Sequence, residues 1–158
     1  MGHIYKSRGN FGLSAQYYQE ALDYMLKNMP DQDPSQLYSS LAEYYRNTQK
    51  DYATALDYCE KALKSAKTER NTAQAMIEKC LVLFRQGRID EFNDCYKEAV
   101  QMADRCKLSA SVSLLIAHIS KNILDKQYEQ AHAHADQLSE EGLHNMPTFT
   151  NAPKTIPT

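Results

Sequence analysis

Two histidines in the stretch Ala-His-Ala-His-Ala are the residues closest in spacing to a reactive or metal-binding pair. Neutral imidazole serves both as a metal ligand and as a general base. His132 and His134 are two positions apart, however, and side chains at that spacing on a helix point to nearly opposite faces. We therefore expect no shared metal site, but a surface helix whose alanines face inward. His118 lies in an apolar stretch and is expected to be a core or interface residue rather than a base.

The four cysteines are the next candidates for chemistry. None of them forms a C-x-x-C pair, and no cysteine–histidine cluster has the spacing of a zinc site. Cysteine is also a small, well-buried apolar residue, so its expected role here is packing within helices. This usage predicts a reducing, cytoplasmic compartment. The positions are Cys59, Cys80, Cys95 and Cys106.

Catalytic motifs are missing from the sequence. There is no glycine-rich phosphate loop, no G-x-S-x-G and no H-E-x-x-H. The carboxylates are expected to lie on solvated helix faces, as in the group Asp57, Glu60, Asp90, Glu91 and Asp94. We therefore predict that the protein is not an enzyme and needs no cofactor.

The net charge and the hydropathy of the sequence argue against two classes of partner. The formal net charge is −2 over 158 residues, which gives no field that would gather nucleic acid or an anionic membrane. No apolar run approaches the roughly 18 residues that a membrane span needs. We expect neither nucleic acid nor membrane as a partner.

The elements that must position any site are predicted to be helices throughout. No proline occurs from Gln36 to Met146, whereas alanine, leucine, glutamate, lysine, glutamine and methionine abound. These residues lose little entropy in a helix. Strict apolar alternation and Asn-Gly or Asp-Gly hairpin signals are missing. The predicted fold class is all-α.

A repeated pattern organises these helices. Three segments align on one template, and the second has one extra residue in its turn. They are Gly2–Leu22, Ala42–Leu63 and Cys80–Val100, with a fainter fourth copy at Ile119–Leu138. Each copy carries a small residue early, a turn, and small residues again in the second half. The turns are closed by residues that we expect to pack: Phe11, Tyr52, Ile89 and Tyr128.

This pattern resembles the tetratricopeptide repeat, in which small residues let paired helices approach and aromatic residues fill the gaps beside them. The copies begin at Gly2, Ala42 and Cys80, so their spacing exceeds the family's usual period of about 34 residues. Long repeats of this type are similar to those of kinesin light chain and of bacterial peptide-sensing regulators. The resemblance implies a right-handed α-solenoid of antiparallel helix pairs, with about three to four repeats.

The resemblance also suggests how the chain is divided. The repeat domain is expected to span residues 1–144, and residues 145–158 are a tail rich in proline and threonine. Met1 and Gly2 align with the middle of a helix, so we expect the first helix to be truncated and the chain to be a fragment of a longer protein. The truncated end and the tail are the two places where self-association is expected, if it occurs.

In proteins with this repeat, the first helix of each pair lines a concave groove that binds a protein or peptide segment. The resemblance therefore implies a scaffold or adaptor module. The alternative is a peptide-sensing regulatory domain of a larger signalling or transcription regulator. The groove is expected to include Lys6, Ser7, Gln36, Ser39, Ser40, Glu43, Arg46, Asn47, Gln74, Ile77, Glu78, Leu81, Phe84 and Arg85.

Three of these residues are expected to anchor the ligand. Arg46 and Phe84 occupy the same repeat position, and Arg85 follows directly, which would flank an aromatic ring with two guanidinium groups. Aromatic and arginine residues are the commonest binding hot spots. On this hypothesis, Arg46→Glu weakens binding and leaves the melting temperature nearly unchanged. The alternative is that Phe84 packs against the next repeat.

Overall fold

The computed structural model describes residues 10–108 and 111–145, and within these ranges the chain is helical and contains no strand. The prediction of an all-α fold is confirmed. In chain order the helices are α2 (Phe11–Asn28), α3 (Ser35–Tyr44), the π-helical turn η1 (Tyr45–Gln49), α4 (Tyr52–Ser65), α5 (Glu69–Arg85), α6 (Ile89–Arg105), α7 (Val112–Leu124) and α8 (Tyr128–Asn145). Lys6, Ser7 and most of the predicted tail lie outside the described residues.

Side chains at helix starts fix where several helices begin. The carboxylate of Asp51 accepts hydrogen bonds from the backbone N–H and the hydroxyl of Thr54, at 3.1 and 2.6 Å. The hydroxyl of Thr68 accepts a bond from the backbone N–H of Asn71 at 3.1 Å. These bonds satisfy donors that the first turn of a helix leaves unpaired. They place the starts of α4 and α5.

Three helices end in the same way. The backbone N–H groups of Arg88, Leu108 and Gln127 donate to the carbonyls of Leu83, Ala103 and Asn122 respectively. In each case the residue before the donor is left-handed: Gly87, Lys107 and Lys126 have φ of 72°, 55° and 60°. This is the Schellman arrangement, which reverses the chain after a helix.

The turn after α3 contains one residue more than the three turns just described. There, Asp51 N–H donates to the carbonyl of Tyr45, after left-handed Lys50, and the turn between them is π-helical. A π turn accommodates one additional residue in a helix. It lies where the second copy of the sequence pattern has its extra residue.

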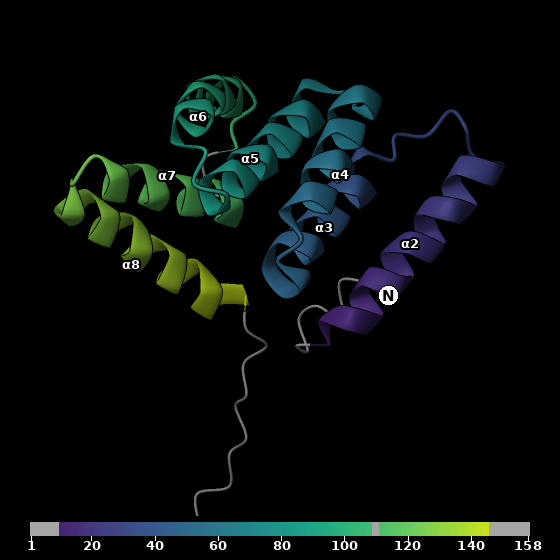
Figure 1. Cartoon of the computed structure of the whole chain (residues 1–158), viewed down its shortest axis with the longest axis horizontal. Coiled ribbons are helices and arrows are strands. Elements are labelled where there is room, and N and C mark those ends of the chain that lie inside the picture. The colour runs from purple at the N-terminus through teal and green to yellow at the C-terminus, as the bar shows by residue number, and fades with distance from the viewer. Residues whose placement is uncertain (1–9, 109–110, 146–158) are drawn as a thin grey trace, which may run out of the picture.

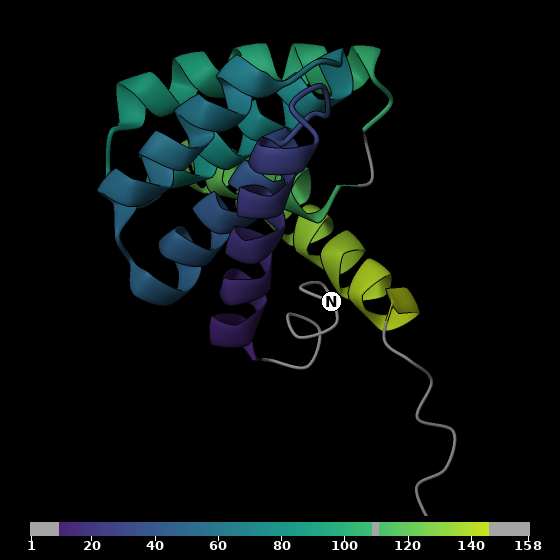
Figure 2. The ribbon, with the colours of Figure 1, turned by 90° about the vertical axis from the view of Figure 1, so that its right-hand side faces the viewer.

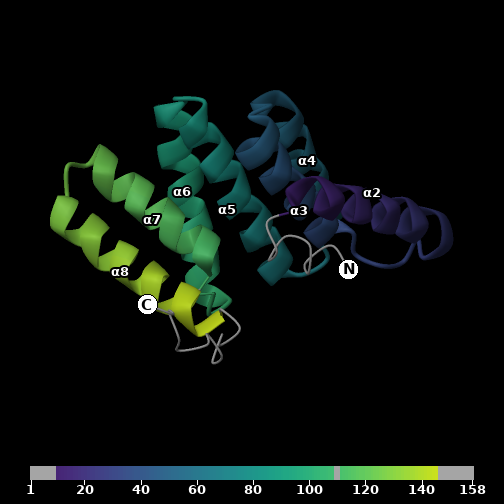
Figure 3. The same ribbon diagram turned by 90° about the horizontal axis from the view of Figure 1, so that it is seen from below.

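The helices are arranged as neighbouring antiparallel hairpins. Helix α3 packs on α4, α5 on α6 and α7 on α8, while α2 packs on α3. The first helices also meet across the pairs, because α5 contacts both α3 and α7. Figure 1 shows this order, with α2 and α8 at opposite ends of the row. Figure 3 shows the same order from below, and Figure 2 views the row from its α2 end.

Small residues are buried where α3, α4 and α5 meet. Ala42 and Ala55 are fully buried in one cluster with Cys59 and Val82, and Ala62 of α4 is also fully buried. A larger cluster between α5, α6 and α7 surrounds Phe92, which is also fully buried. The large Phe92 stands where the pattern has a small residue, and its ring packs against those of Phe84 and Tyr96, with centroids 5.5 and 5.7 Å apart.

Two residues that the pattern assigns to packing are exposed instead. Phe11 is 47% exposed and Tyr128 is 59% exposed, whereas Tyr52 packs against the cluster around Ala42. The physical reason is position, because Phe11 and Tyr128 begin the two outermost described helices, α2 and α8. The expectation that every turn-closing residue packs is wrong at both ends of the row.

Candidate functional site

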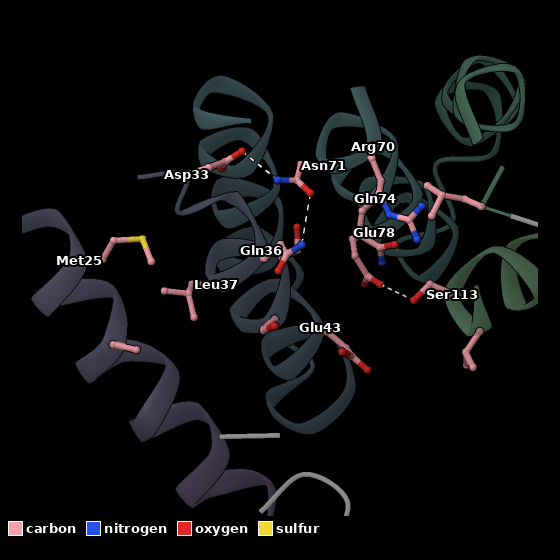
Figure 4. Close-up of a pocket in the computed structure, with 15 residues that line it drawn as sticks. Met25, Asp33, Gln36, Leu37, Glu43, Arg70, Asn71, Gln74, Glu78 and Ser113 are labelled. Carbon is pink, nitrogen blue, oxygen red and sulfur yellow. Dashed lines mark hydrogen bonds between the residues drawn. The ribbon is translucent and has the colours of Figure 1, made fainter. Parts of the chain in front are cut away.

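An open cavity of about 780 Å³ lies along the first helices of the hairpins (Figure 4). Its walls come from α3, α5 and α7, with the end of α2 and the loop before α3 on one side. The lining combines amides, hydroxyls and carboxylates with a few apolar side chains. The residues are Ala21, Met25, Asp33, Gln36, Leu37, Ser39, Ser40, Glu43, Arg70, Asn71, Gln74, Glu78, Leu108, Val112 and Ser113.

The structure brings together six of the residues expected in the groove. On α3 they are Gln36, Ser39, Ser40 and Glu43, and on α5 they are Gln74 and Glu78. A smaller hollow of about 30 Å³ shares Ser40 and Glu43 with the cavity and is also lined by Asn47, Phe11, Tyr18, Tyr44 and Thr48. Ser40 and Glu43 thus lie on the wall between the two hollows.

The apolar residues expected to line the groove on α5 do not form a surface patch. Ile77 and Leu81 are buried, at 0% and 2% exposure, so a ligand on the surface has no access to them. Phe84 is half-buried and packs on Phe92, with ring centroids 5.5 Å apart. Phe92 belongs to the same copy of the pattern, not to the next repeat that the alternative interpretation named. Because α5 contacts α3, α4, α6 and α7, the neighbouring helices cover most of its surface. Arg85 is exposed at the end of α5 but does not line the cavity.

Arg46 is the largest departure from expectation. Its side chain is only 4% exposed, and one terminal nitrogen lies 3.0 Å from a carboxylate oxygen of Glu78, itself 2% exposed. The other terminal nitrogen donates to Asn47 at 2.8 Å, and Nε has no hydrogen-bond partner among the described residues. Arg46 therefore joins η1 to α5 inside the protein, and it is not available as the surface anchor that the repeat position suggested.

Glu78 connects this ion pair to the cavity. Its second oxygen accepts a hydrogen bond from the hydroxyl of Ser113 on α7 at 2.7 Å, as Figure 4 shows. Burial raises the pKa of Glu78, and the guanidinium of Arg46 opposes that shift. A carboxylate held by Arg46 and Ser113 ties together the three elements η1, α5 and α7 at the cavity wall.

A second polar network forms the rim at the opposite end of the cavity. Asp33 accepts hydrogen bonds from the backbone N–H of Ser35, the backbone N–H of Lys67 and the amide of Asn71, at 2.9, 2.7 and 2.9 Å. Gln36 donates to Asn71 at 3.3 Å across the gap between α3 and α5 (Figure 4). Although burial works in the other direction, these bonds lower the pKa of Asp33 to about 2.

Several lining residues were missed from the sequence. The pattern of the first helices gave no reason to include Asp33, Arg70 or Asn71, which belong to the rim. One signal was available for Asp33, because Asp-Pro-Ser before a helix is typical of a capping turn. Val112 and Ser113 were missed because the groove positions were carried only as far as the third copy of the repeat.

The histidines lie apart from the cavity. His118 on α7 and His134 on α8 stack with ring centroids 5.1 Å apart, and the hydroxyl of Tyr96 lies 2.6 Å from Nδ1 of His118. Burial and then His134 lower the pKa of His118. His132 is exposed. Among the described residues, no group of three or more histidines, cysteines or carboxylates is arranged to hold a metal ion.

The chemistry of the cavity suits binding by hydrogen bonds. Amides such as Gln36 and Gln74 both donate and accept, and hydroxyls such as Ser40 do the same. Neither histidine nor cysteine is present among its described lining residues. The arrangement can bind a ligand that carries alternating donors and acceptors beside small apolar groups.

No family model matches the chain, and no curated protein matches its sequence. The resemblance to the tetratricopeptide repeat thus depends on the repeat residues alone. None of the helices that the structure describes is both long enough and apolar enough to cross a membrane.

Proposed function

We propose that this protein is a non-catalytic module that binds an extended segment of a partner protein in the cavity along α3, α5 and α7. In this proposal the hairpins form a solenoid of the tetratricopeptide-repeat type, and the first helix of each pair supplies the binding surface. The module serves as a scaffold or adaptor.

The observation that supports the proposal most is the origin of the lining residues. One polar side chain from each of three successive first helices faces the same cavity: Gln36 from α3, Gln74 from α5 and Ser113 from α7. An extended peptide presents backbone N–H and C=O groups along its length, which side chains spaced along a groove can pair. The repeated use of equivalent helices favours such an elongated ligand.

The size and the mixed lining of the cavity favour the same class of ligand. A volume of about 780 Å³ falls within the range of roughly 300–1,000 Å³ typical of ligand sites. Met25, Leu37 and Val112 offer apolar contacts beside the amides and hydroxyls. A short stretch of peptide with both polar backbone and apolar side chains matches this surface.

A peptide-sensing role is the second candidate, and Glu78 is the residue that favours it. Glu78 lines the cavity and also holds Arg46 and Ser113 on two other elements. A ligand that displaced its carboxylate would loosen η1 and α7 together. Hydrogen exchange separates the roles, because a sensor predicts faster exchange in η1 and α7 on ligand binding, whereas a scaffold predicts unchanged or slower exchange.

The binding proposal is tested with peptides selected from a random display library against the whole chain. We expect selected peptides to bind saturably, and Gln74→Ala to weaken binding roughly threefold to tenfold, the value of one hydrogen bond. Gln101→Ala is the matched control, because Gln101 is exposed on α6, away from the cavity. Equal effects of the two variants, or no saturable binding, would contradict the proposal.

A further inference from the structure

Two cysteines lie against each other on the side of α5 away from the cavity. The sulfur atoms of Cys80 on α5 and Cys95 on α6 are 2.8 Å apart, although all four cysteines of the chain are free thiols here. Cys80 is fully buried, whereas Cys95 is half-buried. The two helices form one hairpin.

We propose that Cys80 and Cys95 are a redox modification site, which a hydroperoxide converts to a reversible disulfide. The placement of the two sulfurs supports this, since a disulfide requires side chains that approach each other from nearby backbones. The hairpin already holds the sulfurs in contact, so bond formation requires little movement of α5 or α6.

The surroundings give the two thiols different roles. The thiol of Cys80 donates a hydrogen bond to the sulfur of Cys95, and this bond, with a further contribution from the charge of Lys79, lowers the pKa of Cys95. For Cys80 the same contact and its burial raise the pKa. The thiolate is the nucleophile in reactions with peroxides. Cys95, which is also the more accessible, is therefore the attacking residue, and Cys80 is the resolving one.

The reaction balances with hydrogen peroxide as the oxidant. The Cys95 thiolate attacks one peroxide oxygen, so an S–O bond forms and the O–O bond breaks. The departing hydroxide takes up a proton and leaves as water, and Cys95 becomes a sulfenic acid. The sulfur of Cys80 then attacks the sulfenic sulfur, an S–S bond forms, the S–O bond breaks, and a second water carries off the Cys80 proton. A small thiol reductant restores both thiols by exchange.

The remaining cysteines provide internal controls. Cys59 is fully buried, and its burial raises its pKa, which makes it a poor nucleophile. Cys106 at the end of α6 is half-buried like Cys95, so the two are comparable in access to peroxide. A difference in reactivity between Cys95 and Cys106 thus reports the effect of the neighbouring thiol.

The test is peptide mapping of the whole chain after mild oxidation. Reduced protein is treated with increasing hydrogen peroxide, its free thiols are blocked, and it is digested with trypsin without reductant. Cleavage after lysine and arginine places the four cysteines in four different peptides, so each linkage is distinguishable. We expect peptide 80–85 linked to peptide 89–97 as the first product, formed at least about tenfold faster than oxidation at Cys106. A thiol reductant should reverse it.

Two variants test the order of events. Cys80→Ser should stop at a sulfenic acid on Cys95, which dimedone traps, whereas Cys95→Ser should show neither the sulfenic acid nor the disulfide. Cys106→Ser should react like the wild type. The proposal is overturned if the wild type links Cys95 to Cys59, links two chains together, or oxidises Cys106 as fast as Cys95.

Discussion

Arg46 and Glu78 place two opposite charges in the interior, and their environment decides what each can do. Both side chains are almost fully buried; Arg46 also donates a hydrogen bond to Asn47, and Glu78 accepts one from Ser113. Removing a charge from water is costly, and a buried pair recovers that cost only while both members are present. The ion pair therefore connects η1 to α5, and it stabilises the protein only while both residues are present.

This arrangement predicts that Arg46→Glu destabilises the protein strongly, contrary to what its repeat position suggests. Breaking a buried pair typically costs about 3–5 kcal/mol, because one charge is left without compensation. Arg85→Glu is the matched control, since Arg85 is exposed, and it should cost less than about 1 kcal/mol. Chemical denaturation measures both. Equal stability of Arg46→Glu and the wild type would mean that the pair does not form.

Asp33 is the other residue whose ionisation supports the site. Its folded-state pKa of about 2 lies below the ordinary aspartate value of 3.8, so the folded protein binds fewer protons than the unfolded chain. The associated stability is present above pH 4 and is lost as the pH falls from about 4 to 2. Because Asp33 is well hydrated, we expect a contribution of only about 1 kcal/mol.

The variant Asp33→Asn tests this sign. Between pH 4 and pH 2 the wild type should lose more stability than the variant, and at pH 7 the variant should be the less stable of the two. Asp31→Asn serves as the control, because Asp31 is exposed. Thermal melting across this pH range checks both. Parallel melting curves for wild type and Asp33→Asn would show that the hydrogen bonds to Asp33 contribute nothing.

At the scale of the elements, the turns after α5, α6 and α7 repeat one backbone geometry with different residues. Gly87 occupies the left-handed position after α5, whereas Lys107 and Lys126 occupy it after α6 and α7. A non-glycine residue in the left-handed region costs roughly 1–2 kcal/mol of stability. Replacing it with glycine recovers only part of that amount, because glycine loses more conformational entropy on folding. The two lysines are therefore sites of local strain.

Lys107→Gly should raise the free energy of unfolding by up to about 1 kcal/mol, since it relieves that strain. Gly87→Lys should lower it by a similar amount. Lys64→Gly is the control, because it makes the same lysine-to-glycine change within the helix α4, where glycine should destabilise the helix. Urea denaturation gives all three values. A destabilising Lys107→Gly would indicate that the lysine side chain makes a contact that outweighs the strain.

At the scale of the whole molecule, the sequence predicts those structural features that depend on residues within a single helical hairpin. Helix content and the buried small residues Ala42, Ala55 and Ala62 follow from composition and from the repeated pattern. The extra residue of the second copy was also visible, and it lies at the π turn η1. These features depend on residues that are close together in the chain, so the sequence is enough to predict them.

The exposure of the site residues depends on contacts between hairpins, which the pattern does not contain. Ile77 and Leu81 share α5 with Gln74, yet they are buried because α5 touches helices of two other pairs. Arg46 and Glu78 are far apart in sequence, and nothing in either segment indicates that they pair. The part played by Ser113 of α7 was missed because the expected groove positions ended with the third copy of the pattern.

A peptide is proposed to bind along the faces of α3, α5 and α7 that line the cavity. The most direct test is an NMR titration of the isotope-labelled chain with a peptide selected by display. The account predicts that the largest amide shifts fall at Gln36, Ser40, Gln74 and Ser113, on three different helices. Shifts confined to α4 and α6, the second helices of their hairpins, would contradict it.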